Sequence, residues 1–577
     1  MGAMFGIVGE GSLGELQVMR QRLAHRGACH QLWSPAPGVY FGQIDRYPLQ
    51  IDSACPLAED VQLDEQPAIN RAELLEREGA AALGGLRGCF SFAFFDAPSR
   101  RLLLAVDQLG YKGLYYVVLR DRLAFASEYK ALLALPDLEA EPDRTVIQHY
   151  LATKHPWLGR TQLARVRALA PGQMLGWASG CVQVSHYWRP VVAEARRSRA
   201  GHAAAIRETF LRVVEREVRG RDEIGITIGG GLDAAAVVGA VRRVAPAVAI
   251  KSFTIGNSDT DPEVLGGRET ARIFGTDHRE TIFRRESIPD QLPRVVWLSE
   301  DCNGREEALL QLKVLGVAGQ HARLVMGGHG ADVLFGGMPR HRLVSIAEAI
   351  PFVRPPLREV YHRSQSGTPT RSLFGRALDH WFYGGAYPPV PVVPGAGEVE
   401  RAIWAERLND VLRDTVQQIW SLRYLEPEHE VAGADFRSPF LDPDLIATAL
   451  SVPGRLKVRW GANKAIFREA VSELVPPAIS QRPKAIQRVG QGQGAELGAV
   501  LGAMAEQVLP GGAVESYGLL SPQDTRSAYE HCVRPAGRNA GGLREQAYGL
   551  WTVLALECWA RQFLARRGAP WRLGSAD

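Results

Sequence analysis

Residues 224–237 read IGITIGGGLDAAAV and constrain the fold more than any other stretch of the chain. Ile224, Ile226 and Ile228 form a short apolar run that stops at three glycines, and an Ala/Val-rich helical pattern follows. This order predicts a buried parallel strand, a tight turn and the start of a helix.

The glycine turn has the chemistry of an anion site. Glycines let the backbone approach a ligand closely, and the N–H groups at a helix start favour an anion. Asp233 lies in the turn, where a carboxylate repels bare phosphate unless a metal ion separates them. The residues therefore predict a nucleotide site that uses Mg²⁺, although a strand–turn–helix without a ligand has the same pattern.

A second glycine-rich turn follows another apolar run and contains His329 and Asp332. Ligands of a doubly wound sheet bind beyond the carboxyl ends of its strands, so we expect the two turns to face each other. Two carboxylates and phosphate oxygens form a hard oxygen site that suits Mg²⁺. His329 lies among glycines, which argues against a core role and leaves a solvated loop histidine as the alternative.

Basic residues near the C-terminal third point to the same ligand. Lys464 follows Gly461 near the start of a predicted helix, where a cation opposes the helix dipole unless an anion is present. This position favours a phosphate partner, and a solvated lysine is the simpler alternative. Arg482 and Lys484 add two cations nearby in sequence.

The pattern along the chain changes near residue 190. Before it, short β-type runs such as residues 89–95 and 101–106 predict packed antiparallel sheets. The polar, basic stretch 192–201 is expected to be a linker. Beyond it, apolar strands alternate with helical segments and then give way to helices, which predicts an α/β fold with a doubly wound parallel sheet and added helices.

Two further segments carry expectations. Residues 350–400 are rich in proline, glycine and aromatic residues and are expected to form a long irregular excursion, either functional or a variable surface insert. The apolar helical stretch 543–563 is expected to lie in the core.

Composition narrows the class of protein. A net charge of +4 over 577 residues does not favour nucleic-acid binding. Seven cysteines without metal-ligand spacing indicate reduced thiols. The chain has neither a signal-peptide pattern nor an uncharged apolar run of about 18 residues. We therefore expect a cytoplasmic protein that binds no nucleic acid and no membrane.

The first glycine turn resembles the pyrophosphate-binding loop of ATP pyrophosphatases, Ser-Gly-Gly-x-Asp-Ser. Gly229 and Ala234 replace its two serines, which removes two hydroxyl donors worth about 1–3 kcal/mol each beside a charged partner. More widely, residues 327–332, 437–442 and 461–468 resemble motifs of asparagine-synthetase-like amide ligases.

Residues 86–133, together with the His-Arg-Gly at 25–27, resemble the glutamine amidotransferase domain of those ligases. The resemblance implies an Ntn-hydrolase-like amidotransferase domain over residues 1–191, a linker over 192–201 and an adenylating, amide-forming domain over 202–577. It also implies ATP and Mg²⁺ as cofactors. The site residues that it implies are Lys464 and His329 for catalysis, Gly229, Gly230, Gly231, Leu232, Asp233, Ile255, Gly327, Gly328 and Lys484 for ATP, and Asp233 and Asp332 for the metal.

One departure from the family pattern concerns the first domain. Phe5 stands where the family has its nucleophilic cysteine, and three residues precede the matching Met4. Phenylalanine cannot act as a nucleophile, so the domain is predicted to be a dead glutaminase. Such domains mark β-lactam synthetases and lasso-peptide cyclases, which adenylate a carboxylate that an amine of the same substrate then attacks.

The leading hypothesis is a lasso-peptide cyclase that joins the N-terminal amine of a core peptide to an Asp or Glu side chain. The resemblance implies a leader-peptide protease and a leader-binding protein as partners. One alternative is a β-lactam-synthetase-like or ammonia-dependent small-molecule amide synthetase. Another is a pseudoenzyme that only binds a peptide or partner, since both loop serines are absent.

Overall fold

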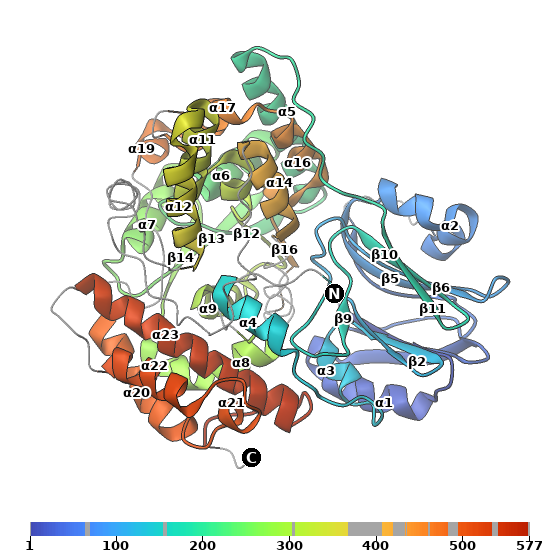
Figure 1. The fold of residues 1–577 in the computed structure, drawn as a ribbon. Helices are drawn as coiled ribbons and strands as arrows, with labels where there is room; N and C mark the ends of the chain where they lie inside the picture. The colour runs from blue at the N-terminus through green and yellow to red at the C-terminus, as the bar shows by residue number, and fades with distance from the viewer. Residues whose placement is uncertain are drawn as a thin grey trace.

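In Figure 1, a domain of two antiparallel sheets lies beside a larger α/β domain, and the C-terminal helices form the lower edge of the molecule. The computed structural model describes residues 2–63, 70–153, 159–302, 306–366, 407–418, 433, 435–459, 462–482, 494–533 and 540–574.

The N-terminal domain is a sandwich of two antiparallel sheets. The first has the order β2-β3-β1-β8-β7-β9 and the second β11-β10-β6-β5-β4. Alternate residues of both sheets meet in one core, in which Phe41 and Phe125 pack with Phe95 and Leu104. The strands are β1 (Gly2–Val8), β2 (Cys29–Ala36), β3 (Val39–Asp45), β4 (Leu57–Leu63), β5 (Gly88–Asp96), β6 (Arg101–Val106), β7 (Tyr115–Leu119), β8 (Arg122–Ala126), β9 (Arg167–Ala168), β10 (Gln173–Ala178) and β11 (Cys181–His186).

The α/β domain is built on a parallel sheet of order β14-β13-β12-β15-β16. Ile224 and Ile226 of β12 are fully buried, as expected for a strand covered on both faces. Strands are added on one side of β12 first and on the other side afterwards, which places the topological switch point beside β12. The strands are β12 (Glu223–Thr227), β13 (Ala249–Gly256), β14 (Asp277–Ile282), β15 (Leu324–Met326) and β16 (Asp435–Arg437).

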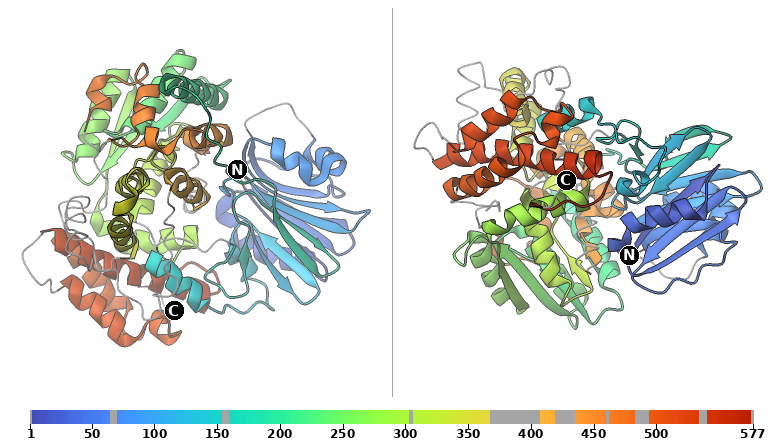
Figure 2. Two further views of the ribbon diagram at one scale, coloured as in Figure 1. Left: turned by 45° about the horizontal axis from the view of Figure 1, so that its top comes forward. Right: turned by 90° about the horizontal axis from the view of Figure 1, so that it is seen from below.

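The helices complete both domains, and the C-terminal group clusters at one end of the α/β domain in both views of Figure 2. The N-terminal domain carries α1 (Leu13–Arg22), α2 (Arg71–Glu78), α3 (Tyr129–Leu132) and α4 (Arg144–Thr153). Around the parallel sheet are α5 (Arg199–Val218), α6 (Leu232–Val244), α7 (Pro262–Phe274), α8 (Ile288–Ser299), α9 (Glu306–Ala318), α10 (Ala331–Phe335), α11 (Pro339–Ala349), α12 (Arg354–Ser366), α14 (Leu408–Gln418), α16 (Pro443–Leu450), α17 (Gly454–Lys457), α18 (Ala465–Ala470) and α19 (Pro477–Ser480). The C-terminal cluster is α20 (Gly494–Val508), α21 (Ala513–Ser516), α22 (Pro522–Val533) and α23 (Ala540–Trp559).

The predicted fold class is confirmed by these sheets, and so is the burial of the last long helix. Leu550, Trp551, Leu554 and Trp559 are at most 3% exposed. The helix ends in a π-helical turn over Ala560–Ala565, which the sequence did not predict.

Two expectations about segments need correction. Helix α5 begins at Arg199, inside the predicted linker 192–201, because the Ser198 side chain accepts the N–H of Gly201 and starts the helix there. Residues 351–366 are helical rather than irregular, since Pro355 and Pro356 fall in the first turn of α12, where no N–H is needed. Residues 367–400 of that predicted excursion lie outside the described residues.

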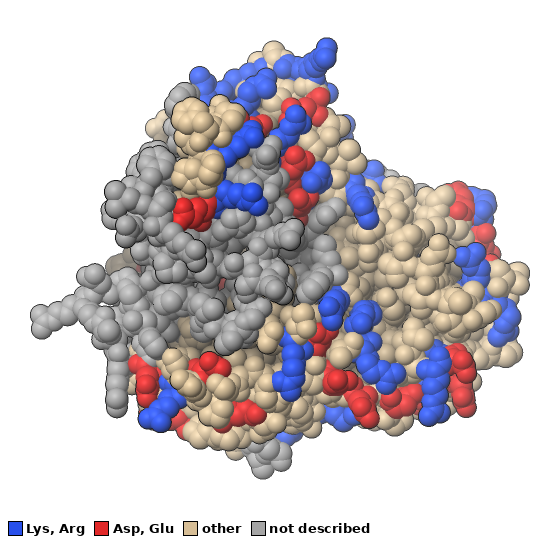
Figure 3. Space-filling view, in the orientation of Figure 1, with Lys and Arg blue, Asp and Glu red and all other residues tan. Residues whose placement is uncertain are grey.

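The surface carries charges of both signs. Lys and Arg side chains lie intermixed with Asp and Glu over the described part of the face in Figure 3, in keeping with the small net charge of the chain. Among the helices that the structure describes, none is long and apolar enough to cross a membrane.

Candidate active site

The two glycine-rich turns lie side by side because they leave neighbouring parallel strands. Ile226 of β12 pairs with Met326 of β15, and α6 and α10 begin a few residues beyond. A Cβ at Gly328 would lie 2.8 Å from the Cβ of Asp233, so the backbones approach closely at a glycine. The structure thus brings together the turns that the sequence expects to face each other.

Lys464 joins the aspartates of the two turns. Its Nζ lies 2.7 Å from Oδ1 and 2.5 Å from Oδ2 of Asp233, and 2.6 Å from Oδ1 of Asp332. The lysine side chain is 7% exposed, and the two aspartates are 23% and 29% exposed. One largely buried cation therefore bridges two partly exposed carboxylates.

The backbone and the charges around Lys464 hold it in this position. Lys464 is the N-cap of α18 and has a left-handed backbone with φ of 57°. A Cβ at Gly337 would lie 1.9 Å from Asp332 Oδ1 and 2.4 Å from Lys464 Cε, so a larger residue there would displace these two side chains. Although burial alone would lower the pKa of Lys464, Asp233 and Asp332 raise it above its ordinary value. The ammonium is therefore charged at neutral pH.

The sequence did not foresee this ion pair. The sequence places Lys464 on phosphates and the aspartates on a metal ion, whereas in the structure the lysine contacts the carboxylates themselves. The anion that offsets the helix dipole at Lys464 is thus supplied by Asp233 and Asp332.

The donor set suits a divalent metal only in part. Within the described residues, no cluster of three or more His, Cys, Asp or Glu could hold a metal ion. Asp233 and Asp332 do converge on a single cation, as a metal site requires. Two carboxylates fit Mg²⁺ when substrate phosphates and water complete the oxygen shell, the arrangement this ion prefers in nucleotide enzymes.

His329 lies in the second turn, next to the wall formed by β16. Its ring meets Phe436 edge-on at 5.2 Å between centroids, and its Nε2 is 3.5 Å from Gln311 Nε2. Burial lowers the pKa of His329 to about 4. The imidazole is therefore neutral at pH 7 and can accept a proton.

Of the remaining predicted nucleotide residues, Leu232 begins α6 after the first turn, and Ile255 lies on the neighbouring strand β13. Leu232 and Ile255 are 8% and 4% exposed, and both side chains pack in hydrophobic clusters. Lys484 lies outside the described residues. Arg482 is close to the loop, since its Nη1 donates to the carbonyl of Gly266 at 3.2 Å.

One residue of the loop environment was missed. Glu263 in the first turn of α7 accepts the N–H of Gly230 through Oε2 at 3.2 Å. The available signal was the Asp-Pro-Glu at 261–263, which follows β13 and starts a helix at the carboxyl edge of the sheet. A helix starting there brings its first turn to the ligand side of the sheet.

The former nucleophile position of the N-terminal domain is filled by hydrocarbon. Phe5 is fully buried in the middle of β1, between Gly42 of β3 and Ala126 of β8. A Cβ at Gly42 would lie 2.4 Å from the Phe5 ring. The Ser127 hydroxyl accepts the N–H of Met4 at 2.9 Å, so the strand is paired on both sides of this position. The site has no thiol, as the sequence predicts.

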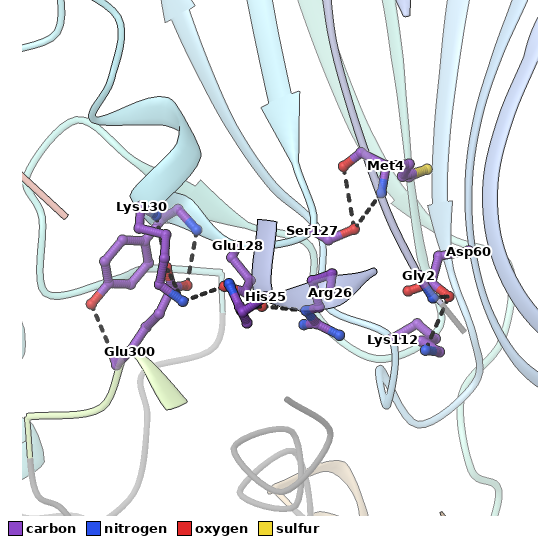
Figure 4. A network of polar contacts seen from close by, with 11 residues as sticks. Gly2, Met4, His25, Arg26, Asp60, Lys112, Ser127, Glu128, Lys130 and Glu300 are labelled. Carbon is purple, nitrogen blue, oxygen red and sulfur yellow. Dashed lines mark hydrogen bonds and ion pairs between the residues drawn. The ribbon is translucent and has the colours of Figure 1, made fainter. Parts of the chain in front are cut away.

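A buried polar network centred on Glu128 lies nearby (Figure 4). Glu128 accepts hydrogen bonds from His25 Nε2 at 3.0 Å, from Arg26 and from Lys130. Arg26, Glu128 and Lys130 are at most 2% exposed. Although burial alone would raise the pKa of Glu128, these neighbours hold it well below its usual range. The Glu128 carboxylate therefore remains ionised among its buried partners.

Glu300 carries this network into the α/β domain. Its carboxylate accepts the N–H groups of Tyr129 and Lys130 at 2.8 and 2.7 Å. The Tyr129 hydroxyl donates to the Glu300 carbonyl at 2.7 Å and accepts from Trp559 Nε1 at 2.7 Å. Burial raises the pKa of Glu300 to about 7. These contacts fasten the N-terminal domain to the α/β domain.

The motif at residues 436–444 also serves the domain interface. Arg437 Nη2 donates to the carbonyl of Gln62 at 2.6 Å, and its Nη1 lies 3.5 Å from Cys89 Sγ. Asp442 caps α16 and pairs with Arg216 of α5. The side chains of Arg437 and Asp442 therefore connect neighbouring elements and do not enter the site between the two glycine turns.

Comparisons with known proteins agree with this architecture. The family model for asparagine synthase matches residues 205–561, and that for the glutamine amidotransferase domain matches residues 72–188. Asparagine synthetase [glutamine-hydrolyzing] 1 of Bacillus subtilis (strain 168) is 24% identical over 441 residues, which cover 70% of this chain and 68% of the relative.

Two further similarities involve a mycobacterial protein and a solved structure. A putative asparagine synthetase [glutamine-hydrolyzing] of Mycobacterium bovis (strain ATCC BAA-935 / AF2122/97) is 25% identical over 444 residues, covering 70% of this chain and 67% of the relative. The structure of glutamine phosphoribosylpyrophosphate amidotransferase from B. subtilis with ADP and GMP has a TM-score of 0.24 and 11% identity, covering 50% of this chain and 92% of that chain.

An α/β domain with paired glycine turns, joined to an amidotransferase-like sandwich, defines an ATP-dependent carbon–nitrogen ligase that forms an amide bond and releases AMP and pyrophosphate. The chain belongs to the asparagine synthase family.

Proposed function

We propose that this ligase closes a ring within a peptide, joining the N-terminal amine of a core peptide to an Asp or Glu side chain as lasso-peptide cyclases do. Phe5 carries the proposal, because a domain without a nucleophile cannot release ammonia from glutamine. The amine must then come from another source. A substrate that holds both reacting groups gains up to about 7–11 kcal/mol from proximity.

In this proposal, Asp233 and Asp332 would hold Mg²⁺ together with the phosphates of ATP. Bound Mg²⁺ would supply charge neutralisation on the triphosphate. The Lys464 ammonium moves from the carboxylates to the phosphates. Mg²⁺ would then neutralise the carboxylates, while Lys464 neutralises the phosphates. The backbone N–H groups of the loop 229–231 complete the phosphate site, and a contribution of Lys484 stays a prediction from the sequence.

The reaction has two steps. A substrate carboxylate oxygen attacks the α-phosphorus of ATP, and the bond to pyrophosphate breaks. The substrate amine then attacks the acyl carbon, AMP leaves, and the amine nitrogen loses one proton. Lys464 stabilises the negative charge of the tetrahedral intermediate.

His329 is the proposed acceptor of the amine proton. Its pKa of about 4 keeps the imidazole neutral and available. A bound phosphate beside the ring would raise this pKa toward the range that suits a base. The edge-on contact with Phe436 fixes the plane of the imidazole ring during the reaction.

The proposal implies a precursor peptide, a leader-binding protein and a leader-peptide protease that exposes the amine, all in the cytoplasm. The test is to incubate the enzyme with a leader-free core peptide, ATP and Mg²⁺. We expect a product lighter by one water molecule, with one AMP per ring. An unchanged peptide mass with every combination of partners contradicts the proposal, and pyrophosphate release with small carboxylates and ammonia would favour a small-molecule amide synthetase.

A further inference from the structure

The first glycine turn accommodates a carboxylate where a serine side chain would lie. A Cβ built at Gly229 would come within 1.8 Å of Glu263 Oε2. Atoms cannot approach so closely, so the Glu263 carboxylate and a side chain at position 229 compete for one volume. The family loop has a serine at this position, and this chain has glycine.

The Glu263 carboxylate also binds the loop in the way expected of a phosphate. Glu263 Oε2 accepts the N–H of Gly230 at 3.2 Å. Backbone N–H groups of such a loop are the donors that hold phosphate oxygens. A serine hydroxyl at this point could donate to phosphate, whereas a carboxylate is acceptor-only and negatively charged. With the Glu263 carboxylate in place of a serine hydroxyl, the loop therefore carries a group that repels phosphate instead of one that donates to it.

Helix α7 holds the glutamate in this position. A Cβ at Gly266 would lie 2.4 Å from the Cα of Gly230, so helix and loop touch backbone to backbone. Thr270 Oγ1 donates to the Gly229 carbonyl at 3.1 Å, and Asp261 caps the N–H of Glu263 at 3.0 Å. The backbone of this turn is thus tied down, and the Glu263 side chain can move only by rotating.

We propose that Glu263 is an internal anion that occupies the pyrophosphate loop of the free enzyme and that the phosphates of ATP displace. Both groups are negative and both need the N–H of Gly230, so they cannot share the loop at full strength. Glu263 therefore lowers the affinity of the loop for ATP, and its rotation accompanies nucleotide binding. This inference rests on ATP use and is independent of the peptide substrate.

The test is calorimetric titration of the full chain with three probes: ATP with Mg²⁺, inorganic pyrophosphate with Mg²⁺, and adenosine. Glu263→Gln keeps the shape and removes the charge. We expect it to bind ATP and pyrophosphate about five- to tenfold more tightly, a change within the range of one screened charge contact. Adenosine lacks phosphate, so its affinity should stay within about twofold.

A matched control lies on the same helix. Glu269→Gln makes the same charge change at a residue that pairs with Arg272 on the surface, and it should leave all three affinities unchanged. A second arm compares Glu263→Ala with Gly229→Ser/Glu263→Ala. The serine now has room and a donor for phosphate, so the double variant should gain about threefold for pyrophosphate.

The outcomes are distinct. Tighter ATP and pyrophosphate binding with unchanged adenosine supports the proposal. If Glu263→Gln binds ATP and pyrophosphate more weakly than the wild type, Glu263 helps to hold the nucleotide and the proposal is wrong. If its affinities match those of Glu269→Gln, Glu263 does not act on the phosphates and the proposal is also wrong. A gain for adenosine as well overturns it too, because a general loosening of the pocket would then explain the result.

Discussion

Replacing Lys464 with methionine tests the cation bridge between the two turns. Methionine keeps an apolar stem of similar length and removes the ammonium that contacts three carboxylate oxygens at 2.5–2.7 Å. Breaking a buried ion pair costs about 3–5 kcal/mol. Because Asp233 and Asp332 are 23% and 29% exposed, water screens the remaining charges. We therefore expect a loss of about 2–3 kcal/mol of stability.

Added Mg²⁺ should recover much of this loss in Lys464→Met. A divalent cation satisfies both carboxylates, and binding to the folded state stabilises it by mass action. In the wild type the ammonium already fills this role, so Mg²⁺ alone should change the unfolding midpoint much less. The assay is thermal unfolding over a series of Mg²⁺ concentrations without nucleotide.

Lys457→Met is the matched control for losing a buried lysine. Lys457 is fully buried, and its ammonium donates to Asn409 Oδ1 at 2.7 Å. Its replacement should destabilise the protein without creating a response to Mg²⁺. In turnover, Lys464→Met should form AMP about 10²–10³-fold more slowly, the usual cost of losing a stabiliser of transition-state charge. The cation bridge would be refuted if Mg²⁺ shifted the unfolding midpoint of Lys464→Met no more than that of the wild type. It would also be refuted if Lys464→Met formed AMP within about tenfold of the wild-type rate.

Three further perturbations probe other parts of the structure. His329 has a pKa of about 4, so the pH profile of kcat/KM should show no step from this residue near pH 6.5. The contribution of His329 as a base should be lost only as the pH falls toward 4. His329→Gln should remove this decrease of kcat/KM at acid pH. Glu300 has a pKa raised from 4.5 to about 7, so the stability it contributes is greatest below pH 4.5 and is lost as pH rises through 7. The advantage of the wild type over Glu300→Gln in thermal unfolding should therefore shrink over this interval, and an advantage that grows would contradict the raised pKa. Phe5→Cys should release no glutamate from glutamine, because β1 is paired on both sides of this position and Met4 precedes it; measurable glutaminase activity would show that the old site survives.

Much of the α/β domain follows from local patterns in the sequence. Ile224 and Ile226 alternate with residues that face the other side of the sheet, and both faces are covered, so the run can only be a buried strand. The glycines after it mark the turn at which the backbone of Gly328 meets Asp233. Strand, turn and helix are therefore predictable from one short stretch.

The contacts between distant residues were not predictable in this way. Lys464 pairs with Asp233 across 231 positions of sequence, and nothing near either residue signals the partner. β16 has three residues and carries no periodicity long enough to recognise. Only its pairing with β15 identifies it as a strand.

The domain interface shows the same limit. The sequence indicates that Phe5 ends glutamine chemistry, but it does not show what holds the domain in place. Glu128 lies two positions from Lys130 in the same domain, whereas Glu300 meets Lys130 only after the two domains fold and dock. Their pKa values move in opposite directions because burial and neighbouring cations act with different strengths on each.

The most direct test of the shared cation site is an experimental structure of the enzyme with Mg²⁺ and a non-hydrolysable ATP analogue. The account predicts one Mg²⁺ about 2.1 Å from an oxygen of each of Asp233 and Asp332, with the Lys464 ammonium moved onto the phosphates. Phosphates bound elsewhere, or Lys464 still between the two carboxylates while the analogue is in place, would contradict it.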